Sequence, residues 1–356
     1  MGAEIALWCI DSSEVNNMIK KFLPGVFSAL GILLLIVDSK TALAGARDGI
    51  ELCLVSVIPS IFPFLVLTGI LTPAIFGARF PLLRPLSRIL GIPAGSEGIF
   101  LTGILGGYPT GAQAVHQAWR QGCLHNEDAK RMLAFCSNAG PSFLFGILGT
   151  RFPEIWMPWL LWGIHIVSAV AVAVLMPGKN STPYTNCPPT SVTVTDSLIK
   201  AVATMGCICG WVVVFRVVLA FLDRWLLWLF PLELRVGIYA LFELANGCCK
   251  TDLIASDGLR FILCSGMLAF GGICVAMQTA SVTGELGLGK YVQGKLLQAM
   301  ISIILSAIAQ YFLFSPTEKV ALSPVFVAIL MLFAAVTTII CLKNKNRASI
   351  LTPVGV

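Results

Sequence analysis

The chain has 356 residues, of which 57% are hydrophobic and only 12% are charged, and its mean hydropathy is +0.87. This composition excludes a soluble domain and is typical of a polytopic membrane protein. The formal net charge is +6, but the basic residues stand beside apolar segments instead of forming one patch. We therefore expect them to orient the chain in the bilayer, and we expect no nucleic acid as a partner.

Apolar segments of about 20 residues are long enough to cross a bilayer. They predict about eight membrane helices, near residues 22–38, 48–73, 130–150, 155–176, 196–222, 258–281, 291–314 and 323–342. Two shorter apolar segments, Ser96 to Gly122 and Leu234 to Cys249, predict re-entrant hairpins that enter and leave on one side. The predicted fold is an all-α polytopic membrane protein with about eight transmembrane helices and two re-entrant hairpins.

Each predicted hairpin is followed by a span that small or polar residues interrupt, at Ser137 to Ser142 and at Ala269 to Gly272. Three crossings separate the two hairpins, so they enter from opposite faces and the halves form an inverted repeat. The predicted parts are an N-terminal helix (1–44), a first repeat (45–176), a Pro-rich cytoplasmic linker (177–195), a second repeat (196–315) and a C-terminal helix with a basic tail (316–356).

The basic residues predict the orientation. Most fall on one side of the predicted spans: Lys20, Lys21, Arg79, Arg84, Arg88, Lys130, Arg131, Lys343, Lys345 and Arg347. The positive-inside rule makes this side cytoplasmic and places both termini there. A minority falls on the other side: Arg224, Arg235, Lys250 and Arg260.

Irregular backbone at membrane depth persists only where protein, water or a bound solute satisfies its N–H and C=O groups. Paired interruptions in two repeats therefore indicate a solute site. In the first repeat, the candidate residues are those of the hairpin tip and the broken span: Gly107, Tyr108, Thr110, Gly111, Asn138, Gly140 and Ser142. A simple surface turn and a proline kink at Pro141 are the alternative interpretations.

In the second repeat, the candidate solute-binding residues are Asn246, Gly247, Gly271, Gly272 and Gln278. Glu243 lies in an otherwise uncharged run, where a carboxylate is costly, and is the candidate coupling acid. An acid at the membrane interface and a helix-to-helix hydrogen bond are the alternatives for Glu243 and Gln278. We expect His165, near the middle of its span, to hydrogen-bond to a neighbour.

The chain has twelve cysteines, and we expect buried small hydrophobic residues instead of a disulfide framework, because most lie inside apolar runs, as Cys53 and Cys136 do. Neither Cys248-Cys249 nor the Cys207–Cys209 spacing has the partners that a zinc site requires. We therefore expect no metal and no cofactor. The chain also has no HExxH, GxSxG or Walker sequence, so we expect no catalytic residues and no enzyme.

Five segments of the chain resemble one known family: Ser56–Phe64, Gly107–Ala112 (GYPTGA), Ser137–Phe143 (SNAGPSF), Glu243–Gly247 and Phe270–Gly272. They resemble sporulation integral membrane proteins with nucleoside-recognition (Gate) domains, over roughly residues 45–315. That family is similar in architecture to concentrative nucleoside transporters, in which hairpin tips and unwound helix centres hold the solute. The resemblance implies a bacterial cytoplasmic membrane, which is the outer forespore membrane in a sporulating cell, and it implies dipicolinate as the solute.

The predicted function is secondary transport of a small anionic metabolite by alternating access. The expected partners are that anion, the lipid bilayer and a coupling H⁺ or Na⁺, while the sequence leaves a homo-oligomer open. The alternatives are a carrier of nucleosides or other small solutes and a membrane scaffold in spore-envelope assembly.

Overall fold

The computed structural model describes residues 25–26, 28–77, 84–176, 178 and 192–315, and these residues form helices and no strand. Most of the predicted linker, the predicted span at 323–342 and the basic tail lie outside the described residues, as does most of the N-terminal part. The end of the predicted linker is already helical, because α10 begins at Val194. The chain is an all-α membrane protein. Six of its described helices are long and apolar enough to cross a bilayer: Ser39–Ile75, Asn126–Arg151, Trp156–Leu175, Val194–Trp225, Asp257–Leu286 and Gly289–Leu313.

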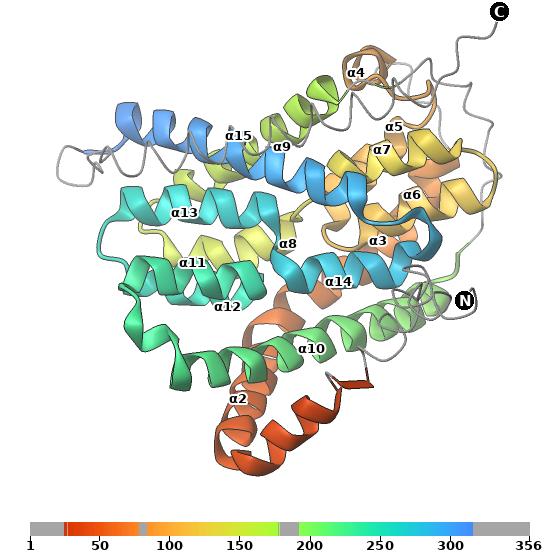
Figure 1. Ribbon diagram of the computed structural model, residues 1–356. Helices are drawn as coiled ribbons and strands as arrows, with labels where there is room; N and C mark the ends of the chain where they lie inside the picture. Colours follow the sequence, from red (N-terminus) through yellow and green to blue (C-terminus); the bar gives the residue numbers. More distant parts are fainter. Residues whose placement is uncertain (1–24, 27, 78–83, 177, 179–191, 316–356) are drawn as a thin grey trace, which may run out of the picture.

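The order of elements recurs along the chain (Figure 1). The first half has a long helix made of α2 (Ser39–Leu52), a π-helical turn (Cys53–Val57) and α3 (Ile58–Gly77), then α4 (Arg84–Leu90), the helix pair α5 (Glu97–Gly106) and α6 (Thr110–Arg120), the interrupted helix α7 (Asn126–Cys136) and α8 (Pro141–Phe143), and α9 (Trp156–Leu175). The second half has the long helix α10 (Val194–Trp225), the pair α11 (Leu232–Phe242) and α12 (Leu244–Lys250), the interrupted helix α13 (Asp257–Phe270) and α14 (Gly272–Thr283), and α15 (Gly289–Leu313).

The second membrane helix begins earlier than the sequence predicts. The described part of the first predicted span is a short apolar helix, Ser28–Val37, and α2 begins at Ser39 instead of near residue 48. The Asp38 side chain caps α2 by accepting from the Thr41 N–H at 3.3 Å. Asp48, at the predicted start of this span, lies within α2 and pairs with Arg216 of α10 at 2.5 Å.

The two interrupted helices occupy the middle of the molecule. In Figure 1, α13 and α14 follow one another across the centre, α15 lies above them and α10 below. The pair α5–α6 packs against α7 and α3, and the pair α11–α12 packs against α13 and α14. The two halves also touch, because α6 of the first pair contacts α14. Both helix pairs therefore lie next to both interrupted helices.

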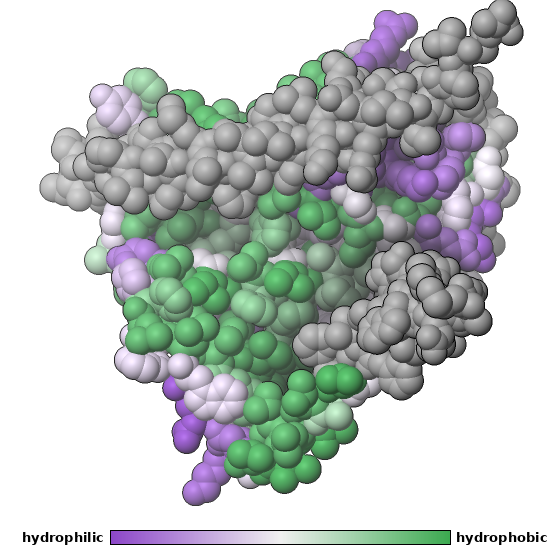
Figure 2. Space-filling model, viewed as in Figure 1, coloured by the Kyte–Doolittle hydropathy of each residue, from purple (hydrophilic) through white to green (hydrophobic). Residues whose placement is uncertain are grey.

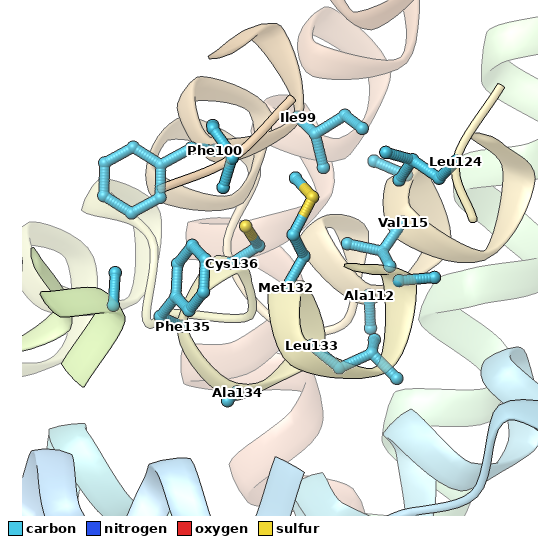
Figure 3. Packing of buried hydrophobic residues seen from close by; sticks show 14 of the residues in the cluster. Ile99, Phe100, Ala112, Val115, Leu124, Met132, Leu133, Ala134, Phe135 and Cys136 are labelled. Carbon is cyan, nitrogen blue, oxygen red and sulfur yellow. The ribbon is translucent and has the colours of Figure 1, made fainter. Parts of the chain in front are cut away.

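A tight apolar core holds α5, α6 and α7 together (Figure 3). Phe100 of α5 and Phe135 of α7 lie with their ring centroids 6.2 Å apart. Val115 of α6 and Met132 of α7 are fully buried in the same cluster. This packing fixes the first helix pair against the helix that is interrupted beyond Cys136.

The outer surface is that of a membrane protein. Figure 2 shows hydrophobic residues over the middle of one face, with hydrophilic residues gathered at its upper right and lower left. Large apolar side chains of α10, such as Val202 and Val214, are exposed, as expected for a helix that faces lipid. The ion pairs Arg224–Asp38 and Arg151–Asp252 each join residues that the predicted topology places on one side.

The Arg131 side chain caps the C-terminal ends of two helices, α4 and α9. Its buried guanidinium donates to the carbonyls of Leu90 and Gly91 at the end of α4, at 2.5 and 2.8 Å, and to that of Ala173 near the end of α9 at 2.8 Å. It also donates to the Met176 carbonyl. These carbonyls have no partner within their own helices, so a positive donor stabilises both helix ends.

We expect Arg131→Met to lower the free energy of unfolding by about 3 kcal/mol, because several charge-assisted hydrogen bonds are lost together. Thermal denaturation of the purified protein in detergent measures this change. Lys130→Met is the matched control, since Lys130 pairs only with the exposed Glu127 at 3.3 Å. Equal melting temperatures for the two variants would contradict the role of Arg131.

Candidate functional site

Four interruptions of helical backbone meet in the centre of the molecule. They are the turn between α5 and α6, the break between α7 and α8, the junction of α11 and α12, and the junction of α13 and α14. A Cβ added to Gly107 in the first turn would lie 2.9 Å from the Gly140 nitrogen. One added to Gly272 in the last junction would lie 2.7 Å from the Ala240 carbonyl oxygen. Only glycine allows these backbones to approach so closely.

The first turn consists of Gly107, Tyr108 and Pro109. Gly107 has a φ of +75°, a conformation that other residues rarely adopt. The Tyr108 hydroxyl donates to the Leu268 carbonyl in α13 at 3.1 Å. The turn of the first half is thereby joined to the interrupted helix of the second half.

The break between α7 and α8 runs from Ser137 to Gly140 in extended conformation at both of its ends. The Ala139 N–H has no helical acceptor and donates instead to Nε2 of His165 in α9, at 3.0 Å. This confirms the prediction that His165 hydrogen-bonds to a neighbour. The Asn138 amide donates to the Phe135 carbonyl at 2.7 Å, so both polar groups satisfy backbone at the break.

The junction of α11 and α12 is built around Glu243. Its carboxylate is buried and accepts three hydrogen bonds, from the Ala245 N–H at 3.0 Å, the Asn246 N–H at 2.6 Å and the Asn246 side-chain amide at 2.7 Å. Glu243 is therefore the N-cap of α12. A negative charge there also complements the positive end of the helix dipole.

The junction of α13 and α14 consists of two glycines with left-handed backbone, Gly271 at φ +81° and Gly272 at φ +82°. A Cβ on Gly271 would touch the Tyr108 ring at 3.3 Å. The first turn and the last junction thus lie in direct contact.

A small cavity lies between these interruptions. It is lined from both halves of the chain, and its lining includes six of the predicted site residues: Gly107, Tyr108, Gly140, Ser142, Glu243 and Gln278. Val57 and Ile61 of the first long helix and Ile208 and Val212 of α10 complete the walls. The cavity leaves about 40 Å³ for water, which is room for roughly three molecules.

Two side chains in the cavity wall have hydrogen-bonding capacity to spare. Ser142 is 4% exposed and its hydroxyl forms no hydrogen bond with any described residue. The Gln278 amide is 6% exposed and contacts only the Cys274 thiol, at 3.4 Å, which is a weak acceptor. A bound solute or water would satisfy both groups.

The remaining predicted site residues do not line the cavity but belong to the elements that form its wall, and they are called the supporting set. The Thr110 hydroxyl donates to the Gly106 carbonyl at 3.3 Å. Gly111 and Gly247 permit close helix contacts, with Cys136 and Ala240 respectively. The last four residues of this supporting set are Asn138, Asn246, Gly271 and Gly272.

One group at this centre was missed from the sequence. Lys295 of α15 is 1% exposed, and its Nζ donates to Oε1 of Gln298 at 2.7 Å, to the Tyr108 hydroxyl at 3.4 Å and to Oδ1 of Asn138 at 3.5 Å. Gln298 also donates to Asn138 Oδ1 at 3.1 Å. The sequence does contain a signal for this group. Lys295 stands three residues before Gln298 inside an apolar span, and this spacing places both side chains on one face of the helix.

Comparison with known proteins gives no match, since no family model, no curated protein and no solved structure is similar to this chain. The resemblance to Gate-domain proteins therefore stays a prediction from its motifs.

We expect Gly272→Ala to lower the free energy of unfolding by about 2–4 kcal/mol, because alanine is strained at positive φ and its Cβ would meet the Ala240 carbonyl. The melting temperature in detergent measures this effect. Gly206→Ala is the control, since Gly206 lies in the exposed face of α10 with nothing within 4 Å of an added Cβ. A Gly272→Ala protein as stable as this control would refute the close approach.

Proposed function

We propose that the chain is a secondary transporter that carries a small anionic metabolite across the membrane by alternating access. The observation that carries this proposal is the meeting of four helix interruptions, two from each half, at one cavity. Interrupted helices are costly in a bilayer, and they are found where they line a pathway or a site. Paired interruptions in inverted repeats are the known arrangement for such a site.

An anion suits the helix starts at this centre. The helices α6 and α14 begin at Thr110 and Gly272, each directly after an interruption and without a side-chain cap. Helix N-termini carry unpaired N–H groups and partial positive charge, which favour carboxylates and phosphates. Dipicolinate is the first candidate solute, because a planar aromatic dicarboxylate matches these helix starts and the Tyr108 ring.

The small volume of the cavity bears on mechanism. Room for roughly three water molecules does not hold an aromatic dicarboxylate, so the walls must separate before the solute enters. Alternating access requires such a closed form between the two open ones. The helix pairs α5–α6 and α11–α12 are the elements whose displacement would open the cavity, because each contributes one turn to its wall.

Ser142→Ala and Gln278→Leu test the solute contacts. We expect each to lower the kcat/KM of dipicolinate uptake about tenfold, because the solute loses one hydrogen bond in a dry site. Uptake of labelled dipicolinate into proteoliposomes is the measurement. Ser281→Ala is the matched control, since Ser281 lies on α14, as Gln278 does, but is exposed.

Two results would contradict transport through this cavity. Wild-type proteoliposomes that take up neither dipicolinate nor nucleosides under any ion gradient would favour the membrane scaffold. Saturable uptake that is unchanged in Ser142→Ala and Gln278→Leu would keep transport but move the solute elsewhere.

Glu243 is the proposed coupling acid, and Glu243→Gln separates this role from helix capping. Glutamine keeps one acceptor for the α12 N–H groups but cannot carry a proton through the cycle. We expect uphill accumulation driven by a pH gradient to be lost, while exchange of labelled for unlabelled solute continues. Accumulation that persists in the variant would leave Glu243 with its capping role alone.

A further inference from the structure

Lys295 is a buried lysine that has no acidic partner among the described residues. The three oxygens near its Nζ belong to Gln298, Tyr108 and Asn138, and all are neutral. No ion pair joins Lys295 to a carboxylate among the described residues. Three acceptors match the three N–H donors of an ammonium group, so hydrogen bonding is satisfied while the charge is not.

An uncompensated charge inside a membrane protein is costly and is retained for function. The buried carboxylate at this centre, that of Glu243, is bound to the N–H groups of Ala245 and Asn246 and forms no ion pair with Lys295.

The lysine lies one aromatic ring from the cavity. Its Nζ is 5.3 Å from the centroid of the Tyr108 ring, and Tyr108 lines the cavity. The Tyr108 hydroxyl donates to the Leu268 carbonyl, so its lone pairs are free to accept from Lys295. Gln298 bonds to Asn138 in the break between α7 and α8, which fixes the lysine relative to the cavity wall.

We propose that Lys295 is the fixed positive charge that makes the cavity select carboxylates over neutral solutes of the same shape. This inference rests on the proposed transport function and assigns its charge selectivity to one residue. The field of the ammonium group acts through the Tyr108 ring in a medium that screens it far less than water. A carboxylate in the cavity supplies the negative charge that the protein itself does not place beside Lys295.

Two probes of one shape test this proposal: pyridine-2,6-dicarboxylate, which is dipicolinate, and the neutral pyridine-2,6-dicarboxamide. Their dissociation constants are measured by calorimetry with the purified full chain in lipid nanodiscs. We expect the wild type to prefer the diacid by about tenfold or more. Lys295→Met keeps the side-chain length, and we expect it to lose that preference by weakening diacid binding while diamide binding stays within about twofold.

Lys290→Met is the matched control, because Lys290 lies on the same helix but is exposed, and it should keep the wild-type preference. Lys295→Gln serves as a second neutral variant if Lys295→Met does not fold, as judged by its melting temperature. A wild type that binds the diamide as tightly as the diacid overturns the inference without any variant.

The outcomes separate this inference from the transport proposal. If the wild type binds the diacid and a neutral Lys295 variant keeps the full preference, the inference fails and transport stands. If the wild type binds neither probe nor any other carboxylate or nucleoside and transports none, the proposed function fails and the inference fails with it.

Discussion

The structure depends on one constraint: backbone N–H and C=O groups that leave a helix inside an apolar protein must find partners there. At the break between α7 and α8, His165 accepts from the Ala139 N–H. At the junction of α11 and α12, the Glu243 carboxylate accepts from two successive N–H groups of α12. The Tyr108 hydroxyl donates to the Leu268 carbonyl just before the junction of α13 and α14. At three of the four interruptions a side chain thus satisfies backbone groups, and close packing brings the four together.

An acid and a lysine are buried at this centre and lie on different elements. Glu243 lines the cavity from the second helix pair, whereas Lys295 lies behind Tyr108 of the first. Neither is paired with an opposite charge within the described part of the chain, although pairing is the usual way to keep charges inside a protein. An anion and a coupling proton would supply the missing partners, so the two groups fit a carrier better than a rigid scaffold.

The sequence predicted where the helices break, because glycine, proline and small polar residues inside apolar runs have local backbone consequences. The sequence located six membrane helices, and it identified residues that line the cavity, among them Gly107, Ser142 and Gln278. It did not predict the start of α2, since the partner of Asp48 lies on α10, far along the chain. Nor did it predict the contacts of Lys295, because those depend on three elements that only the tertiary fold brings together.

The most direct measurement is thiol labelling of Ser142→Cys in a cysteine-depleted background, with a membrane-impermeant reagent supplied from either side of sealed, oriented vesicles. A cavity that opens alternately predicts labelling from both sides, slowed on both by excess dipicolinate. Gly206→Cys, which faces outward from α10, should show no such protection. Labelling of Ser142→Cys from one side only, or labelling that the solute never slows, would contradict a shared site between the two halves.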